Sequence, residues 1–264
     1  MKNSARFVLV LIKYKLTHAM VFRLSFFGAC FVDGSMFALQ LAMMSAIYSQ
    51  VDAIGDWGRG AMIIFIGTYS LLNAINMTIY FFGLNGIPGK VRSGELDHYV
   101  TKPVSPLLRL TFESVDLGSA PLIALSIVII LYGVGVAGVA PTAGQVALYC
   151  VLILLMVVLY YDLEVILRTI AFFTLASGDV LGEFEGAAFS LCMKLPGTLL
   201  KGLYKAVFWF ALPYGVMATV PSRVLMGILE PESIAYAAFA AVAFTFIAVR
   251  FFYYGLRHYK SASS

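Results

Sequence analysis

The chain has 264 residues, of which 61% are apolar and only 12% are charged. A soluble domain carries roughly 25% charged residues, so this composition excludes an ordinary soluble protein and indicates a polytopic membrane protein. The net charge of +4 is small, and the basic residues lie beside apolar runs, which argues against a nucleic-acid partner. The three cysteines and three histidines are scattered, so neither a disulfide framework nor a metal site is predicted.

Residues 1–19 carry four basic side chains around a short apolar core at residues 7–12. That core is shorter than the apolar region of a signal peptide, which spans about 7 to 15 residues. We therefore expect an interfacial helix, whose basic residues face anionic lipid headgroups while its apolar residues enter the acyl boundary.

The first membrane span is predicted within residues 21–48. Asp33 follows Arg23 by ten residues, which is about 15 Å along a helix and close to the bilayer centre. A carboxylate at that depth is costly unless it is hydrated, paired or protonated, so Asp33 would face a subunit interface or a cavity. Alternatively, the span begins near Gly34 and Asp33 lies at the membrane surface.

The second span, residues 61–84, carries small and polar residues at steps of three and four, which places them on one helix face. These residues are Gly67, Ser70, Asn73, Asn76 and Tyr80. In lipid such a face usually packs against another helix, with Asn side chains donating interhelical hydrogen bonds. Helix packing is the favoured interpretation, and a substrate-facing surface is the alternative.

The loop at residues 85–116 contains the most charge-dense passage of the chain, KVRSGELDHYVTKPVSPLLRL. The run Ser93-Gly94-Glu95 predicts the start of a short helix, because a hydroxyl can cap free N–H groups and acidic residues suit the first turn. Lys102-Pro103 is expected to end that helix, since proline cannot donate to the helix ladder. A short charged helix between two spans is suited to contact with a soluble partner.

The third span is predicted at residues 117–139, where Gly133, Gly135 and Gly138 form a G-x-G-x-x-G run. A dinucleotide site needs that run to follow a strand and open a helix, so here the glycines are expected to allow close helix packing instead. The segment from Gly86 to Lys90 lacks the first glycine and the final hydroxyl residue of a phosphate-binding loop. We therefore expect no ATP site on this chain.

The fourth span is predicted at residues 144–167, followed by an emergence into the headgroups where Glu164 and Arg168 can pair four residues apart. Residues 169–199 are expected to form a cytoplasmic connection along the membrane, with a re-entrant hairpin as the alternative. The fifth and sixth spans are predicted at residues 203–220 and 234–254. The predicted fold is thus all-α and polytopic, with about six transmembrane helices in a single domain.

The distribution of basic residues predicts the orientation. In this layout 16 Lys and Arg residues fall on one side of the membrane, against Arg59 and Arg223 on the other. The positive-inside rule then places both termini and the 85–116 loop in the cytoplasm.

The charged loop resembles the loop between the second and third spans of permease subunits of bacterial type-2 ABC exporters, with its pattern R-x-G-E-L-D…L-x-K/R-P-V-S-x-L. The matching residues are Arg92, Gly94, Glu95, Leu96, Asp97, Lys102, Pro103, Val104, Ser105 and Leu107. Val100 stands where that family usually has Leu, and a looser likeness covers most of the chain.

The resemblance implies six helices in the bacterial cytoplasmic (inner) membrane and a transport subunit without enzymatic activity of its own. It further implies a separate ABC ATP-binding subunit that carries ATP and Mg²⁺, a second permease that is identical or homologous, and an ATPase-coupling role for the segment from Arg92 to Pro103. Two other classes stay open: an ion-coupled carrier, for which Asp33 is the one supporting residue, and a lipid-modifying membrane enzyme, for which no catalytic cluster is apparent.

Overall fold

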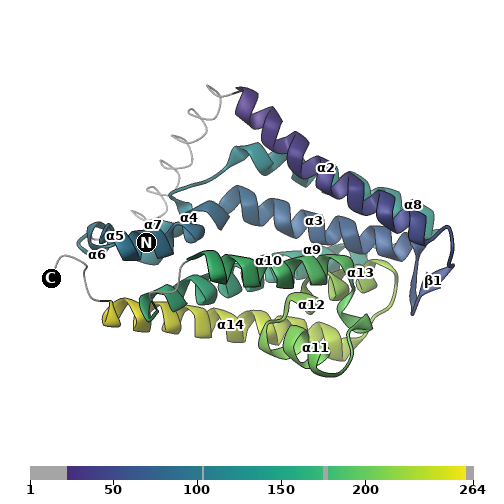
Figure 1. Cartoon of the computed structure of the whole chain (residues 1–264). Helices are drawn as coiled ribbons and strands as arrows, with labels where there is room; N and C mark the ends of the chain where they lie inside the picture. Colours follow the sequence, from purple (N-terminus) through teal and green to yellow (C-terminus); the bar gives the residue numbers. More distant parts are fainter. Residues whose placement is uncertain (1–22, 103, 175–177, 260–264) are drawn as a thin grey trace.

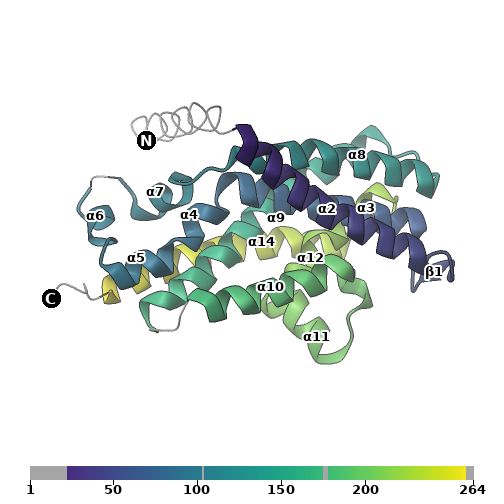
Figure 2. The same cartoon turned by 45° about the horizontal axis from the view of Figure 1, so that its top comes forward.

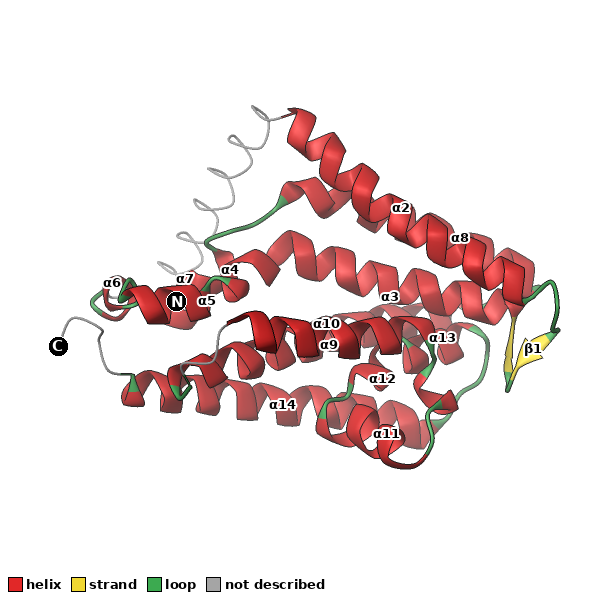
Figure 3. Ribbon diagram, in the orientation of Figure 1, coloured by secondary structure: helices red, strands yellow, loops and turns green. Residues whose placement is uncertain are grey.

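The computed structural model describes residues 23–102, 104–174 and 178–259. This part of the chain is helical apart from one short antiparallel hairpin, in which β1 (Ala53–Ile54) pairs with β2 (Trp57–Gly58), as Figure 3 shows. The all-α fold class is therefore confirmed. The predicted interfacial helix at residues 1–19 lies outside the described residues.

Long helices that run lengthwise through the molecule form its frame (Figure 1, Figure 2). They are α2 (Arg23–Ile47), α3 (Arg59–Ile79), α8 (Ala120–Ala137), α9 (Ala143–Thr169), α10 (Gly178–Lys194) and α14 (Pro231–His258). The shorter α-helices are α4 (Phe81–Asn85), α5 (Ile87–Ser93), α6 (Asp97–Val100), α7 (Pro106–Phe112), α11 (Gly202–Ala206), α12 (Tyr214–Met217) and α13 (Thr219–Leu225). Three 3-10 turns and one π-helical turn complete the described elements: η1 (Leu117–Ser119), η2 (Ile170–Phe172), η3 (Gly197–Leu199) and the π turn η4 (Val207–Ala211).

By length and composition, four described helical segments can cross a membrane, and a bent pair makes a fifth if it counts as one span. The four are Arg59–Ile79, Leu117–Ala137, Ala143–Phe172 and Pro231–His258, while α2 contributes a shorter apolar helix, Gly34–Ile47. In α3, 78% of the apolar window is buried inside the molecule, against 28% for the third span and 22% for α14. Helix α3 is thus central, and the other two leave most of their apolar surface free for lipid.

Helices α3 and α8 approach each other closely at glycines. A Cβ atom on Gly133 would lie 2.8 Å from the backbone N of Ile64, and one on Gly67 would lie 2.7 Å from Cγ1 of Ile130. Such contacts between small residues hold transmembrane helices together through van der Waals packing. Gly138 adopts a left-handed φ of 64° and ends α8. The glycine run therefore serves helix packing at Gly133 and helix termination at Gly138.

The prediction for residues 169–199 is wrong. Instead of a connection along the cytoplasmic surface, α10 runs lengthwise beside α9 and α3 (Figure 1, Figure 2). Near its end, the Met193 carbonyl accepts from Gln40 Nε2 of α2 at 2.8 Å, and in the following turn η3 Thr198 Oγ1 accepts from Trp57 Nε1 of the β hairpin at 2.8 Å. The hydropathy of this segment does not indicate a helix inside the bundle, because Glu185 lowers it. The sequence alone does not show that Arg168 of α9 pairs with Glu185 and makes its burial possible.

The predicted fifth span at residues 203–220 falls on a bent pair of helices. Residues Gly202–Ala211 and Tyr214–Leu225 form two apolar helical pieces that bend by 77° where they meet. Pro213 lies at the break, where it cannot donate a backbone hydrogen bond, and the preceding turn is π-helical. These residues form a broken span or a re-entrant loop.

Because α10 runs lengthwise through the molecule, three basic residues lie on the other side from the one predicted. Lys194 and Lys201, and with them Lys205 in α11, now lie toward the end of the molecule that carries Arg59 and the β hairpin. The predicted distribution of Lys and Arg becomes thirteen against five. The asymmetry is smaller but keeps its direction.

Candidate functional site

The charged loop forms a group of short helices at one end of the molecule, residues 87–112, which we call the coupling segment after the role that the resemblance implies (Figure 1). Helix α5 ends at Ser93 because Gly94 adopts a left-handed φ of 76°. The single turn α6 then begins at Asp97. The prediction that Ser93-Gly94-Glu95 starts a helix is therefore wrong, although the Glu95 N–H does donate to Ser93 Oγ at 3.4 Å.

Two largely apolar side chains anchor the coupling segment. Leu96 is fully buried and Tyr99 is 8% exposed, and both belong to a cluster with Leu84, Ile87 and Leu107, among others. Burial of a leucine side chain contributes about 1.5–3 kcal/mol relative to exposure. The position of the loop is therefore fixed by packing from α4, α5 and α7 rather than by its charges.

Polar contacts around Glu113 support this anchor. Lys90 Nζ lies 3.0 Å from Glu113 Oε1, and the Tyr99 hydroxyl donates to the same carboxylate. The Arg109 guanidinium lies 4.3 Å from the centre of the Tyr99 ring, in cation–π geometry. Burial, followed by the hydrogen bond to Glu113, raises the pKa of Tyr99 well above its usual value, so its hydroxyl remains a donor.

The outer surface of the coupling segment carries the charged residues for which a coupling role was predicted. Arg92, Glu95 and Lys102 are exposed, and Asp97 is half-buried at the start of α6. Val100 is 50% exposed between them. Of the other predicted coupling residues, Gly94 ends α5, Leu96 is the buried anchor, and Pro103 lies outside the described residues. The surface thus combines fixed charges of both signs with an apolar side chain.

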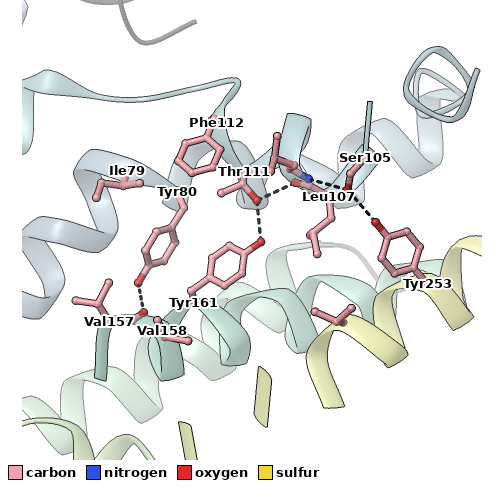
Figure 4. Close-up of a pocket in the computed structure, with 12 residues that line it drawn as sticks. Ile79, Tyr80, Ser105, Leu107, Thr111, Phe112, Val157, Val158, Tyr161 and Tyr253 are labelled. Carbon is pink, nitrogen blue, oxygen red and sulfur yellow. Dashed lines mark hydrogen bonds between the residues drawn. The ribbon is translucent and has the colours of Figure 1, made fainter. Parts of the chain in front are cut away.

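The coupling segment is tied directly to two long helices (Figure 4). Ser105 caps the N-terminus of α7, and its Oγ lies 2.8 Å from the Tyr253 hydroxyl of α14. Within α7, Thr111 Oγ1 lies 2.8 Å from the Tyr161 hydroxyl of α9. A Cβ atom on Gly83 of α4 would lie only 2.2 Å from the Leu110 carbonyl oxygen, so α4 and α7 are in backbone contact. A displacement of the coupling segment would therefore reach α9 and α14 through short contacts.

Figure 4 also shows a cavity beneath α7. It has a volume of about 460 Å³ and is lined mainly by apolar side chains from α3, α7, α9 and α14. The Tyr80 hydroxyl donates to the Val157 carbonyl at 3.1 Å across one of its walls. The packing beneath α7 is therefore incomplete, in contrast to the close contact between α4 and α7.

The remaining predicted site residues lie elsewhere. Asn73 and Asn76 of α3 line a polar cavity between α3, α9 and α10, and the Asn76 side chain faces Glu164 of α9. Their prediction as helix-packing or substrate-facing residues stays a prediction. Asp33 lies in α2, but its side chain is outside the described part of the structure. Its prediction as an interface or pathway residue stays a prediction.

The polar cavity contains a charged cluster of which the sequence indicated one pair. Glu164 and Arg168 do pair, at 3.3 Å, and both are buried within the molecule. Glu185 of α10 forms a second ion pair with Arg168 and was not singled out from the sequence. The signal available was the presence of Glu164 and Arg168 in α9 and Glu185 in α10, because ionisable residues within long helices are costly in lipid unless they meet.

These features define an all-α membrane protein in which the long apolar helices contact the charged coupling segment at one end. Residues 35–263 match the family described as ABC-2 family transporter protein, and the chain belongs to that family. The match includes both the coupling segment and the polar cavity. The resemblance to type-2 ABC permeases is thereby confirmed, and the chain is an ABC transporter permease. A search of curated proteins finds no match.

Proposed function

We propose that this chain is the permease subunit of an ABC exporter, moving a substrate across the bacterial cytoplasmic membrane with ATP hydrolysed on a separate ATP-binding subunit. A second permease, identical or homologous, would complete the pathway. ATP and Mg²⁺ would bind the partner subunit, because the sequence of this chain carries no phosphate-binding loop. The thirteen-to-five distribution of Lys and Arg favours a cytoplasmic position for the coupling segment and both termini.

The observation that carries the proposal is the construction of the coupling segment. Its buried residue Leu96 fixes its position, while Arg92 and Glu95 stay exposed. Charges held on a rigid surface set the register of a protein interface through electrostatic complementarity. The hydrogen bonds from α7 to α9 and α14 provide a route by which partner movement reaches the spans.

A charge swap tests this role. Arg92→Glu together with Glu95→Lys keeps the net charge and alters only exposed side chains, so membrane insertion should be unchanged. Co-purification of the ATP-binding subunit from the native host should fall by about tenfold or more, since like charges facing each other cost several kcal/mol. Substrate-stimulated ATP hydrolysis should fall with it.

Asp52→Lys is the control, because Asp52 is an exposed acidic residue on the loop at the opposite end of the molecule. It should leave co-purification intact. If the swapped variant retains the ATP-binding subunit as well as the wild type does, the coupling segment is not the docking element and the proposal fails.

A further inference from the structure

The cavity of about 460 Å³ beneath α7 has a lining that suits hydrocarbon rather than a polar solute. Its walls are mainly apolar, and a cavity of that kind holds no ordered water. The five hydroxyl groups in its described lining all have hydrogen-bond partners within the protein, and they belong to Tyr80, Ser105, Thr111, Tyr161 and Tyr253. A polar solute would therefore find no unsatisfied hydroxyl group in this lining.

The cavity opens toward lipid at α9 and α14. Val158 of α9 and Val249 of α14 line it and are 41% and 37% exposed. Both residues belong to helices that can cross a membrane, so their exposed side chains face acyl chains. Tyr161 and Tyr253 also line the cavity, and tyrosine is enriched at the level of the lipid headgroups. An acyl chain can therefore enter from the side while its headgroup stays at the membrane surface.

Basic side chains lie beside one end of the cavity, where Ser105 and Tyr253 meet (Figure 4). Arg257 follows Tyr253 by four residues, which is one turn or about 6 Å further toward the end of α14. Lys102 precedes Ser105 by three residues. Both basic side chains are exposed, and the ion pairs between described residues include neither of them. Their charge is therefore available to an anionic headgroup.

We propose that an anionic phospholipid binds at this site, with one acyl chain in the cavity beneath α7 and its phosphate at Arg257 and Lys102. The chain completes the packing that the protein leaves open, and the phosphate takes the two positive charges. The lipid would contact both the coupling segment and the spans, because the cavity lies between α7 and helices α9 and α14. Binding needs no ATP-binding subunit, so this inference does not depend on the proposed function.

The probes are phosphatidylglycerol and phosphatidylcholine with identical acyl chains, which differ in the net charge of the headgroup. Native mass spectrometry of the full-length permease in detergent, titrated with each lipid, measures binding. Phosphatidylglycerol should bind saturably and at least roughly tenfold more tightly than phosphatidylcholine, since each basic residue near the membrane surface contributes about fivefold to the binding of an anionic lipid.

Matched charge variants locate the headgroup. Lys102→Gln together with Arg257→Gln should weaken phosphatidylglycerol binding by roughly tenfold or more. Lys201→Gln together with Lys205→Gln is the control, because it removes the same charge from two exposed residues at the opposite end of the molecule. The control should leave binding at the tight site unchanged.

Matched tryptophan variants locate the acyl chain. Val249 and Ile247 are exposed apolar residues two positions apart on α14, and only Val249 lines the cavity. An indole group at position 249 would displace about two methylene groups of the chain, each worth about fourfold in binding. Val249→Trp should therefore weaken phosphatidylglycerol binding by roughly tenfold, whereas Ile247→Trp should not change it.

Three outcomes would overturn the proposal. Equal binding of the two lipids would show that the headgroup charge is not recognised. Equal weakening by the two charge variants would mean that the effect is not specific to Lys102 and Arg257. If Val249→Trp binds phosphatidylglycerol as tightly as Ile247→Trp does, the acyl chain lies outside the cavity.

Discussion

The contact between α3 and α8 gives a sharp test of the fold, because two glycines of α8 lie in opposite environments. A Cβ atom added at Gly133 would lie 2.8 Å from the backbone N of Ile64, whereas one added at Gly135 would meet nothing within 4 Å. Backbone atoms cannot move aside as a flexible side chain can. Gly133→Ala should therefore push the two helices apart, at a cost of about 1–3 kcal/mol, the range measured for overpacked cores.

Gly135→Ala should instead be neutral or stabilising by up to about 1 kcal/mol, since alanine is the better helix former. The two variants add the same methyl group two residues apart, so lipid partitioning and expression effects largely cancel. Thermal unfolding of the purified permease in detergent should give a lower midpoint for Gly133→Ala than for Gly135→Ala. Equal midpoints would refute the close α3–α8 contact.

Three further tests address the coupling segment and the topology. Leu96→Ala removes a fully buried side chain and should lower the local stability of the coupling segment by about 2–5 kcal/mol. Faster hydrogen exchange across residues 87–112 would show this loss, whereas Val100→Ala, at a half-exposed position, should change the exchange little. Tyr253→Phe removes the hydroxyl that meets Ser105, worth about 0.5–1.5 kcal/mol, and should weaken substrate stimulation of ATP hydrolysis without loss of the ATP-binding subunit. With the native cysteines replaced, an impermeant thiol reagent applied to intact cells should label Asp52→Cys, on the exposed loop at the opposite end, but not Ser93→Cys. The reverse result would invert the orientation.

The sequence was sufficient for the elements whose signal is local. The central helix α3 and the lipid-facing α8 were predicted from continuous apolar runs, and Gly133 from its position within one of them. These predictions needed no knowledge of neighbouring helices, because a long apolar segment must cross or enter a bilayer whatever its surroundings.

The elements that depend on partners were missed. Helix α10 contains Glu183 and Glu185, which lower its hydropathy, and only contact with Arg168 on α9 makes the second of these tolerable inside the bundle. In the same way, Ser93-Gly94-Glu95 has the composition of a helix start, but the positive φ of Gly94 ends the preceding helix instead. Composition describes what a residue prefers, whereas the outcome depended on contacts with residues distant in sequence.

Helix α9 links the two sites. Tyr161 contacts Thr111 of the coupling segment, and Arg168, seven residues further along the same helix, holds Glu185 of α10. The two contacts are separated by about 10 Å along the helix axis, so a rigid shift of α9 driven at Tyr161 acts directly on the Arg168–Glu185 pair. Removal of one partner from a buried ion pair costs about 3–5 kcal/mol, so this contact contributes strongly to holding α9 against α10. We infer that the pair holds α9 and α10 together, and that a movement of the coupling segment would reach the cavity between them through α9.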